Sequence, residues 1–172
     1  DAAVFLPPYN EEMVISTDTY ISGVHGPTSL NPTDAARRAI LIASSDLAAM
    51  AADPLCVFIA INLPKNATKN YLENLATGIG LGLKDTRLAL AGGNISVYEG
   101  NLSLNVTVVG SVPKGLAIGR KGARPGDLLV ISGCIGDGYL GLNLLQGEFK
   151  DIKKEYKDTL ITNFLQPVPR LN

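Results

Sequence analysis

Met13-Val14-Ile15-Ser16-Thr17-Asp18-Thr19 is the stretch on which the fold prediction depends. An apolar, β-branched run that ends in hydroxyls and a carboxylate predicts a strand that delivers oxygen ligands to the edge of a sheet. Hard cations such as Mg²⁺ prefer oxygen ligands of this kind. A carboxylate at a strand end is also common where a strand passes into a turn, so Asp18 alone does not decide between the two interpretations.

The composition is that of a globular domain, with 172 residues of which 46% are hydrophobic and 18% charged. Lys and Arg number 15 against 16 Asp and Glu, so the net charge is −1. This balance gives no support to a nucleic-acid partner or to an anionic membrane surface. No apolar run approaches the roughly 20 residues that span a bilayer. We therefore expect a soluble protein of the cytoplasm.

Cysteine and histidine usage argues against a zinc site, because the chain has one histidine and no C-x-x-C pair. Cys56 and Cys134 lie in apolar segments and are predicted to be buried free thiols. The chain opens at Asp1 without a start methionine, and the Pro-containing residues 166–172 have the composition of a linker. We expect one domain over residues 1–165 and a linker over 166–172 that leads to a further domain.

Hydrophobic periodicity and turn residues predict an α/β (α+β) fold, with an antiparallel or mixed sheet flanked by helices. Asn31-Pro32-Thr33-Asp34 is a strong helix start, because Asn caps and Pro suits the first helical position. The expected strands cover residues 2–6 (a hairpin partner of 13–18), 55–61 (buried on both faces), 87–91, 102–108 (half-exposed) and 128–132 (buried). The expected helices cover residues 31–52, 68–83, a segment that begins near Gly138, and 151–165.

Asp46 is the second candidate ligand. Helical spacing places it on one face with Ala39 and Ala43, inside the apolar stripe of the 31–52 helix. A carboxylate buried there is costly unless it is paired or bound to a metal. The alternatives are a metal-ligand role, or a cap or salt bridge with Arg37 or Arg38, although Arg37 points to the opposite side of the helix. We expect Asp1, Asp18 and Asp46 to converge around metal-bound phosphates.

Three loops carry further candidate residues. Gly92-Gly93-Asn94 is predicted to be a turn whose backbone N–H groups approach a phosphate, although structural turns of this kind are as common. The basic, glycine-rich loop around Arg120 is suited either to clamping phosphate or to simple solvation. His25 lies in the loop after the Asp18 strand, where functional residues gather. The G-x-x-G-x-G run at Gly133 lacks the spacing of a dinucleotide fingerprint.

The separate stretches match one family when they are taken in order. They are Asp1-Ala2-Ala3-Val4, Ser16-Thr17-Asp18-Thr19, Gly23-Val24-His25, Ser45-Asp46-Leu47-Ala48-Ala49-Met50, Gly92-Gly93-Asn94, Arg120-Lys121-Gly122-Ala123-Arg124-Pro125-Gly126-Asp127 and Leu165-Gln166-Pro167-Val168-Pro169-Arg170. From residue 1 to 172 the chain resembles the thiamine-monophosphate kinase family. That family belongs to a superfamily of ATP-using synthases that includes aminoimidazole ribonucleotide synthetase and selenophosphate synthetase.

The resemblance implies an N-terminal domain like that of aminoimidazole ribonucleotide synthetase, whose sheet pairs across a homodimer, with ATP between this domain and a C-terminal one. It also implies roles for individual residues. The implied Mg²⁺ ligands are Asp1, Ser16 (through its carbonyl), Thr17 (through its side chain), Asp18, Asp46 and Asn94. The implied ATP contacts are Gly93, Asn94 and Arg120, and the implied contact to thiamine monophosphate is His25. Many family members have Asp where Asn94 stands, and an amide brings no charge to a metal.

The implied reaction is transfer of a phosphoryl group from ATP to thiamine monophosphate with several Mg²⁺ ions. The acceptor is an ionised phosphate oxygen, so in-line positioning and charge screening replace a strong base. Two alternatives stay open at this point. The first alternative is that the chain is another synthase of the superfamily, although the selenium enzyme would need a reactive Cys near its N-terminus. The second is that the chain is a non-catalytic module for nucleotide binding or dimerisation.

Overall fold

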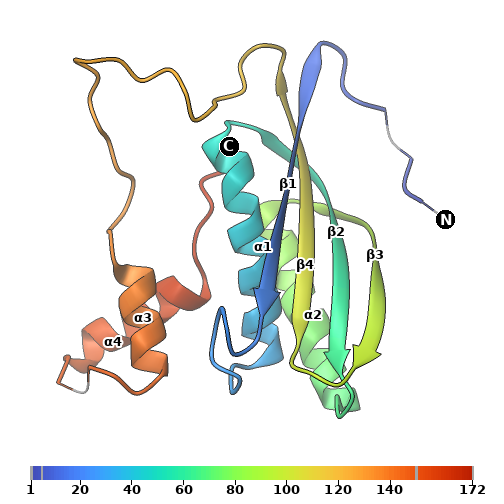
Figure 1. The fold of residues 1–172 in the computed structure, drawn as a ribbon, viewed down its shortest axis with the longest axis vertical. Coiled ribbons are helices and arrows are strands. Elements are labelled where there is room, and N and C mark those ends of the chain that lie inside the picture. Colours follow the sequence, from blue (N-terminus) through green and yellow to red (C-terminus); the bar gives the residue numbers. More distant parts are fainter. Residues whose placement is uncertain (1, 5, 150, 172) are drawn as a thin grey trace.

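A four-stranded mixed sheet covered by helices on one face forms the centre of the computed structural model (Figure 1). The structure describes residues 2–4, 6–149 and 151–171. The strands are β1 (Glu11–Ile21), β2 (Asp53–Pro64), β3 (Ala89–Tyr98) and β4 (Ser103–Pro113). The helices are α1 (Pro32–Ala49), α2 (Lys69–Thr86), α3 (Asp137–Leu145) and α4 (Lys154–Leu165). The predicted fold class is confirmed.

The sheet has the strand order β1-β4-β2-β3, so β4 lies inside it and β1 and β3 are its edges. β4 runs antiparallel to both β1 and β2, whereas β2 and β3 are parallel. In one row across the sheet, Asp18 pairs with Val106, Val106 with Ile59, and Ile59 with Gly93. This row fixes where the candidate residues lie relative to one another.

One face of the sheet carries the core. Val57, Val106 and Val108 are fully or almost fully buried under α1 and α2, which lie on the same side of the sheet (Figure 1). The other face, which we call the open face, carries the alternate residues, such as Ile15 and Phe58. Alternate residues of β2 are buried and the rest are only half-buried, so the expectation of a strand buried on both faces is wrong. Among the described residues, no helix covers the second face of this strand.

α1 begins as its sequence predicts, because the Asn31 side chain accepts a hydrogen bond from the Thr33 N–H at 2.9 Å. α2 then packs on α1 with very little space between the two backbones. A Cβ added at Gly78 would lie 2.2 Å from the Thr33 carbonyl oxygen, and one added at Gly82 would lie 2.9 Å from Ile40 Cδ1. Glycine at these positions is therefore what lets the two helices approach.

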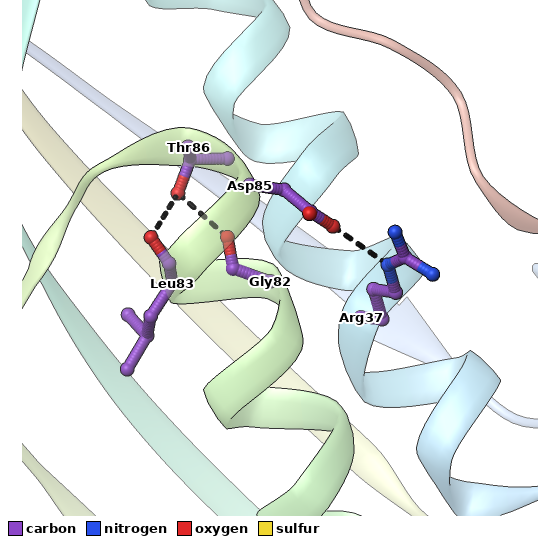
Figure 2. Close-up of polar contacts among 5 residues, drawn as sticks. All are labelled: Arg37, Gly82, Leu83, Asp85 and Thr86. Atoms are coloured by element: carbon purple, nitrogen blue, oxygen red, sulfur yellow. Dashed lines mark hydrogen bonds and ion pairs between the residues drawn. The ribbon is translucent and has the colours of Figure 1, made fainter.

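The C-terminal end of α2 is joined to α1 by polar contacts (Figure 2). Arg37 Nε donates to Asp85 Oδ2 at 2.7 Å. Thr86 is buried, and its hydroxyl donates a hydrogen bond to the Gly82 carbonyl oxygen at 2.8 Å and a longer one to the Leu83 carbonyl oxygen at 3.4 Å. The Arg37–Asp85 pair joins the two helices at this end, whereas the hydroxyl bonds of Thr86 stay within α2.

Two expectations near the N-terminus are corrected by the strand pairing. The described residues 2–4 and 6 are not in a strand, and β1 pairs with β4 instead of forming a hairpin with them. β1 and β4 each have eleven residues and pair along their full length. The short segment 2–6 would form far fewer backbone hydrogen bonds with β1. Asp1 lies outside the described residues.

The predicted turn at Gly92-Gly93-Asn94 is also wrong, because β3 runs straight through it from Ala89 to Tyr98. The pairing with β2 shifts between Val57 and Phe58, so that Leu90 and Gly92 face consecutive residues and Ala91 is the extra one. A bulge of this kind lets a strand absorb an irregular residue and continue. Tertiary pairing with β2 overrides the turn preference of the glycines.

The segment between β4 and α3 has neither helix nor strand, although residues 128–132 were expected to form a buried strand. Leu128, Leu129 and Val130 are 89%, 98% and 80% exposed. Both cysteines are free as expected, but Cys134 is exposed because it lies in this uncovered segment, and Cys56 is only partly buried. α3 and α4 follow as a pair that contacts the rest of the domain mainly through α1 (Figure 1).

No helix in the described part of the chain is long and apolar enough to cross a bilayer.

Replacing Gly78 with Ala should lower the free energy of unfolding by about 1–3 kcal/mol, because the new methyl group collides with the Thr33 carbonyl. Gly80→Ala is the matched control on the same helix, since nothing lies within 4 Å of its added Cβ. It should raise the stability by about 0.5–1 kcal/mol through helix propensity. Urea unfolding followed by circular dichroism measures both, and a stabilising Gly78→Ala would contradict the packing.

Candidate functional site

Ser16, Asp18 and Asp46 gather where β1 meets the C-terminal half of α1, and we call them the β1–α1 cluster. Ser16 and Asp18 are two positions apart on β1, so both side chains lie on the face that α1 covers. Ser16 Oγ donates to Asp46 Oδ2 at 2.5 Å. The Thr19 N–H donates to Asp18 Oδ1 at 2.7 Å. Two carboxylates and a hydroxyl therefore offer oxygen donors at one edge of the sheet.

Asp46 is exposed, so the expectation of a carboxylate inside the buried stripe is wrong. Ala39 and Ala43 on the same side of α1 are buried, but Asp46 lies near the end of the helix beside Ser16 on the edge strand β1, where its side chain reaches solvent. Neither neighbouring arginine neutralises it. Arg37 pairs with Asp85 (Figure 2), and Arg38 donates to the carbonyl of Phe164. The Asp46 carboxylate is available for a ligand on the solvent side.

His25 lies in the turn directly after β1. Its Nδ1 accepts a hydrogen bond from the Ile21 N–H at 2.9 Å. In the neutral imidazole the proton is therefore on Nε2, which is left as a donor. The ring lies 6.2 Å from the Tyr20 ring, centroid to centroid. The loop thus presents an oriented N–H donor close to the end of the strand that carries Asp18.

Asp18 and His25 line the same cavity, which has a volume of about 360 Å³. Its other walls include Tyr20 and Arg38, together with Tyr139 from α3. The cavity is large enough for a small ligand. It is the place where the candidate metal ligand Asp18 and the candidate substrate contact His25 come together.

Thr17 lies on the other side of the sheet. Its Oγ1 is 2.9 Å from Thr107 Oγ1 on β4, on the open face. The alternation of a strand separates its hydroxyl from those of Ser16 and the carboxylate of Asp18. Within one chain, the Thr17 side chain therefore does not reach the β1–α1 cluster, and only its main-chain atoms lie near enough to act as ligands there.

Gly93 and Asn94 lie on the far edge of the sheet from the β1–α1 cluster. Gly93 is in the same row as Asp18, but β4 and β2 stand between them. Three strand spacings of about 4.8 Å separate the two edges by about 14 Å. Asn94 pairs with Ala60 on the open face, and its amide donates to Ser96 Oγ at 3.3 Å. A single chain therefore does not bring Asn94 to Asp18 and Asp46.

Gly93 also has a structural reason to be glycine, since a Cβ there would lie 2.0 Å from the Ile59 carbonyl oxygen. Arg120 lies exposed in the segment between β4 and α3, away from the cavity that holds Asp18 and His25. Asp1, the remaining candidate ligand, falls outside the described residues. The sequence-predicted residues thus divide into one assembled group and several that stand apart.

Arg38 and Tyr20 also line the cavity, although no functional role was predicted for either residue. Tyr20 sits in the strand pattern as an ordinary core residue, and Arg38 was considered only as a partner for Asp46. Nothing local to α1 marks Arg38, because its covering residue, Phe164, is more than a hundred positions away on α4. Residues 2–4, 6–149 and 151–171 contain no group of three His, Cys, Asp or Glu residues placed to hold a metal ion.

Comparison with protein families matches residues 1–112 to the model described as AIR synthase related protein, N-terminal domain. The chain is 35% identical over 171 residues to the thiamine-monophosphate kinase of Escherichia coli strain K12, which covers 99% of this chain and 52% of that enzyme. The chain spans about half the length of the curated relatives it matches.

Solved structures give the same result. The crystal structure of thiamine-monophosphate kinase from Stenotrophomonas maltophilia K279a matches with a TM-score of 0.87 and 33% identity, over 99% of this chain and 54% of that one. The structure of AaThiL complexed with AMPPCP and TMP matches with a TM-score of 0.85 and 30% identity, over 96% and 52%. The fold is therefore shared along essentially the whole chain.

Gly93→Ala should destabilise the fold by about 1–3 kcal/mol even without nucleotide, because the methyl group collides with the Ile59 carbonyl. Gly92→Ala is the matched control, since its nearest neighbour, Phe58 Cδ1, would be at an ordinary 3.4 Å. Thermal unfolding in nucleotide-free buffer measures both. Equal melting temperatures for the two variants would show that the close approach of β2 and β3 does not constrain Gly93.

Proposed function

The chain belongs to the family of AIR synthase related proteins, as an N-terminal domain, and on this basis we propose that it is the metal- and nucleotide-binding half of a thiamine-monophosphate kinase. The observation that carries the proposal is the shared cavity of Asp18 and His25, beside the hydrogen bond between Ser16 and Asp46. The kinases similar to this chain are aligned along 99% of it. We place the reaction in the cytoplasm.

In the proposed reaction, a terminal phosphate oxygen of thiamine monophosphate attacks the γ-phosphorus of ATP. The new P–O bond forms as the bond from the γ-phosphorus to the β,γ-bridging oxygen breaks, which gives thiamine diphosphate and ADP. The nucleophile is already ionised, so no residue has to remove a proton from it. The chain's task is to hold two polyanions in line against their repulsion.

The β1–α1 cluster fits Mg²⁺ by donor chemistry, since hard cations take carboxylate and hydroxyl oxygens. Asp18, Asp46 and the Ser16 hydroxyl would hold it, with Asp1 and the main chain of Thr17 as further proposed ligands. When bound, Mg²⁺ supplies positive charge that screens the phosphates and stabilises the transferred group. His25 orients the acceptor phosphate through its Nε2–H. Gly93, Asn94 and Arg120 are the proposed contacts to ATP. Asn94 is also a further proposed ligand of Mg²⁺.

Asp18→Asn and Asp46→Asn should each lower kcat for thiamine diphosphate formation by about 100-fold or more, the scale of losing one transition-state-stabilising group. Both changes keep the side-chain volume and remove a charged oxygen donor. Product is measured by chromatography with ATP, Mg²⁺ and thiamine monophosphate present. Asp158→Asn on the exposed face of α4 is the control and should keep normal turnover. Near-normal turnover in the Asp18 and Asp46 variants would refute the metal assignment.

Supplying ATP with each acceptor of the superfamily in turn separates the proposal from its alternatives. ADP release with thiamine monophosphate alone supports the kinase. ADP release only with an aminoimidazole precursor or with selenide would assign the chain to another synthase. Tight binding of ATP and Mg²⁺ without turnover of any acceptor would favour the nucleotide-binding module.

We also propose that two copies of the protein pair through the open face of the sheet. Ile15 on this face is 63% exposed, and Phe58, two strands away on the same face, is only half-buried. Burying apolar side chains of this size favours association. Asn94 is on the same face, so the dimer interface and the proposed ATP contact share one side of the sheet.

Ile15→Asp should shift the protein from dimer to monomer, because a charge replaces an apolar side chain at the interface. Val97→Asp is the matched control, since Val97 is also 63% exposed but lies on the opposite face. Sedimentation velocity measures the mass, and the KM for ATP should rise only in the Ile15 variant. A wild-type monomer, or a dimer that survives Ile15→Asp, would contradict this pairing.

A further inference from the structure

Arg38 is a half-buried cation held against α4. Its guanidinium carbon lies 3.7 Å from the centroid of the Phe164 ring. Its Nη1 donates to the Phe164 carbonyl oxygen. The Nε atom is buried and, among the described residues, has no hydrogen-bond partner. A buried N–H without an acceptor costs free energy, so this unsatisfied donor favours the binding of a group that carries an acceptor atom.

Arg38 also lacks a counter-charge. No carboxylate of the described residues forms an ion pair with it, whereas its neighbour Arg37 pairs with Asp85 at 2.7 Å (Figure 2). Burial lowers the pKa of Arg38 to about 10, while the nearby Tyr20 acts to raise it, so the guanidinium is still charged at neutral pH. A desolvated positive charge without a negative partner favours the binding of an anion.

The geometry of the guanidinium indicates what kind of anion it takes. Nη1 is occupied by the Phe164 carbonyl, which leaves the edge formed by Nε and Nη2. The two N–H groups of that edge are parallel and match two oxygens of a phosphate or carboxylate. Because Nε is buried here, the side chain has to shift for both groups to face a ligand.

Arg38 lines the 360 Å³ cavity that also holds Asp18, Tyr20 and His25. The Tyr20 hydroxyl is also buried; burial raises its pKa, and the charge of Arg38 and a side-chain contact with Ser22 lower it. The unused Nε–H of Arg38 and the Tyr20 hydroxyl thus border the space beside His25. Arg38 also lines a second cavity of about 650 Å³, between α1, α3 and the C-terminal segment.

We propose that Arg38 binds the phosphate group of the acceptor substrate, through the Nε–Nη2 edge, in the cavity that it shares with His25. This inference rests on the proposed function. Both substrates carry phosphate, and we assign Arg38 to the acceptor because His25, the proposed acceptor contact, faces the same cavity. Arg38 then supplies positive charge to the acceptor phosphate, whereas Asp18 in the same cavity would act on it only through a bound cation.

Arg38→Gln should raise the KM for thiamine monophosphate by about 10- to 100-fold, as expected when hydrogen bonds from a charged donor are lost. The KM for ATP should change less than about twofold. Arg38→Lys keeps the positive charge but lacks the two parallel N–H groups, so it should recover only part of the lost affinity for thiamine monophosphate. A raised KM for ATP, or no change for either substrate, would overturn the proposal.

Thiamine, which lacks the phosphate, gives a direct second readout. By isothermal titration calorimetry, wild type should bind thiamine monophosphate more tightly than thiamine, and Arg38→Gln should reduce this preference by about 10-fold or more, with the rest due to His25. An unchanged preference for the phosphate in the variant would show that Arg38 does not bind it. This measurement is independent of turnover.

Two control variants separate binding from folding. Leu75→Ala, a buried substitution on α2 away from the cavity, should lower the melting temperature and leave both KM values unchanged. Arg37→Gln removes the adjacent charge, which is paired with Asp85 on the other side of α1, and should leave both KM values unchanged. A wild-type protein that forms no thiamine diphosphate would overturn the proposed function itself, whereas an active enzyme indifferent to Arg38→Gln would overturn only this inference.

Discussion

The close contact between α1 and α2 is the constraint on which the candidate site depends. Glycines at 78 and 82 let the α2 backbone reach α1, and this close packing sets the distance between the two helices. A bulkier α2 would push α1 along the sheet. Because α1 carries both Asp46 and Arg38, its position decides whether the acidic side chain meets Ser16 and whether the basic one reaches the cavity.

Strand alternation divides the site between the two faces of the sheet. Ser16 and Asp18 lie on the covered face with α1, whereas Thr17 lies on the open face with Thr107. Asn94 is likewise on the open face, three strands away from β1. A consecutive run of oxygen-bearing residues therefore serves two surfaces. We propose that one surface holds the acceptor and metal, and that the other pairs with a second copy.

Features with a local physical cause were predictable from the sequence. The capped start of α1 and the alternation of β4 both follow from the residues at those positions. The features that were not predictable depend on distant partners. β3 continues through Gly92 and Gly93 because β2 supplies its hydrogen bonds. Asp46 is exposed because it lies beside Ser16 on the edge strand β1, and Arg38 is covered by Phe164 from far along the chain. The roles of Asp1, Asn94 and Arg120 stay predictions.

The uncovered run from Leu128 to Ile131 has a consequence for handling the protein. Its side chains are between 61% and 98% exposed, and its backbone belongs to no sheet. Extended apolar segments with free N–H and C=O groups add readily to the edge of another sheet. At high concentration, molecules in which this run stays bare will tend to associate by strand addition, and their solubility will fall before their helices and sheet unfold.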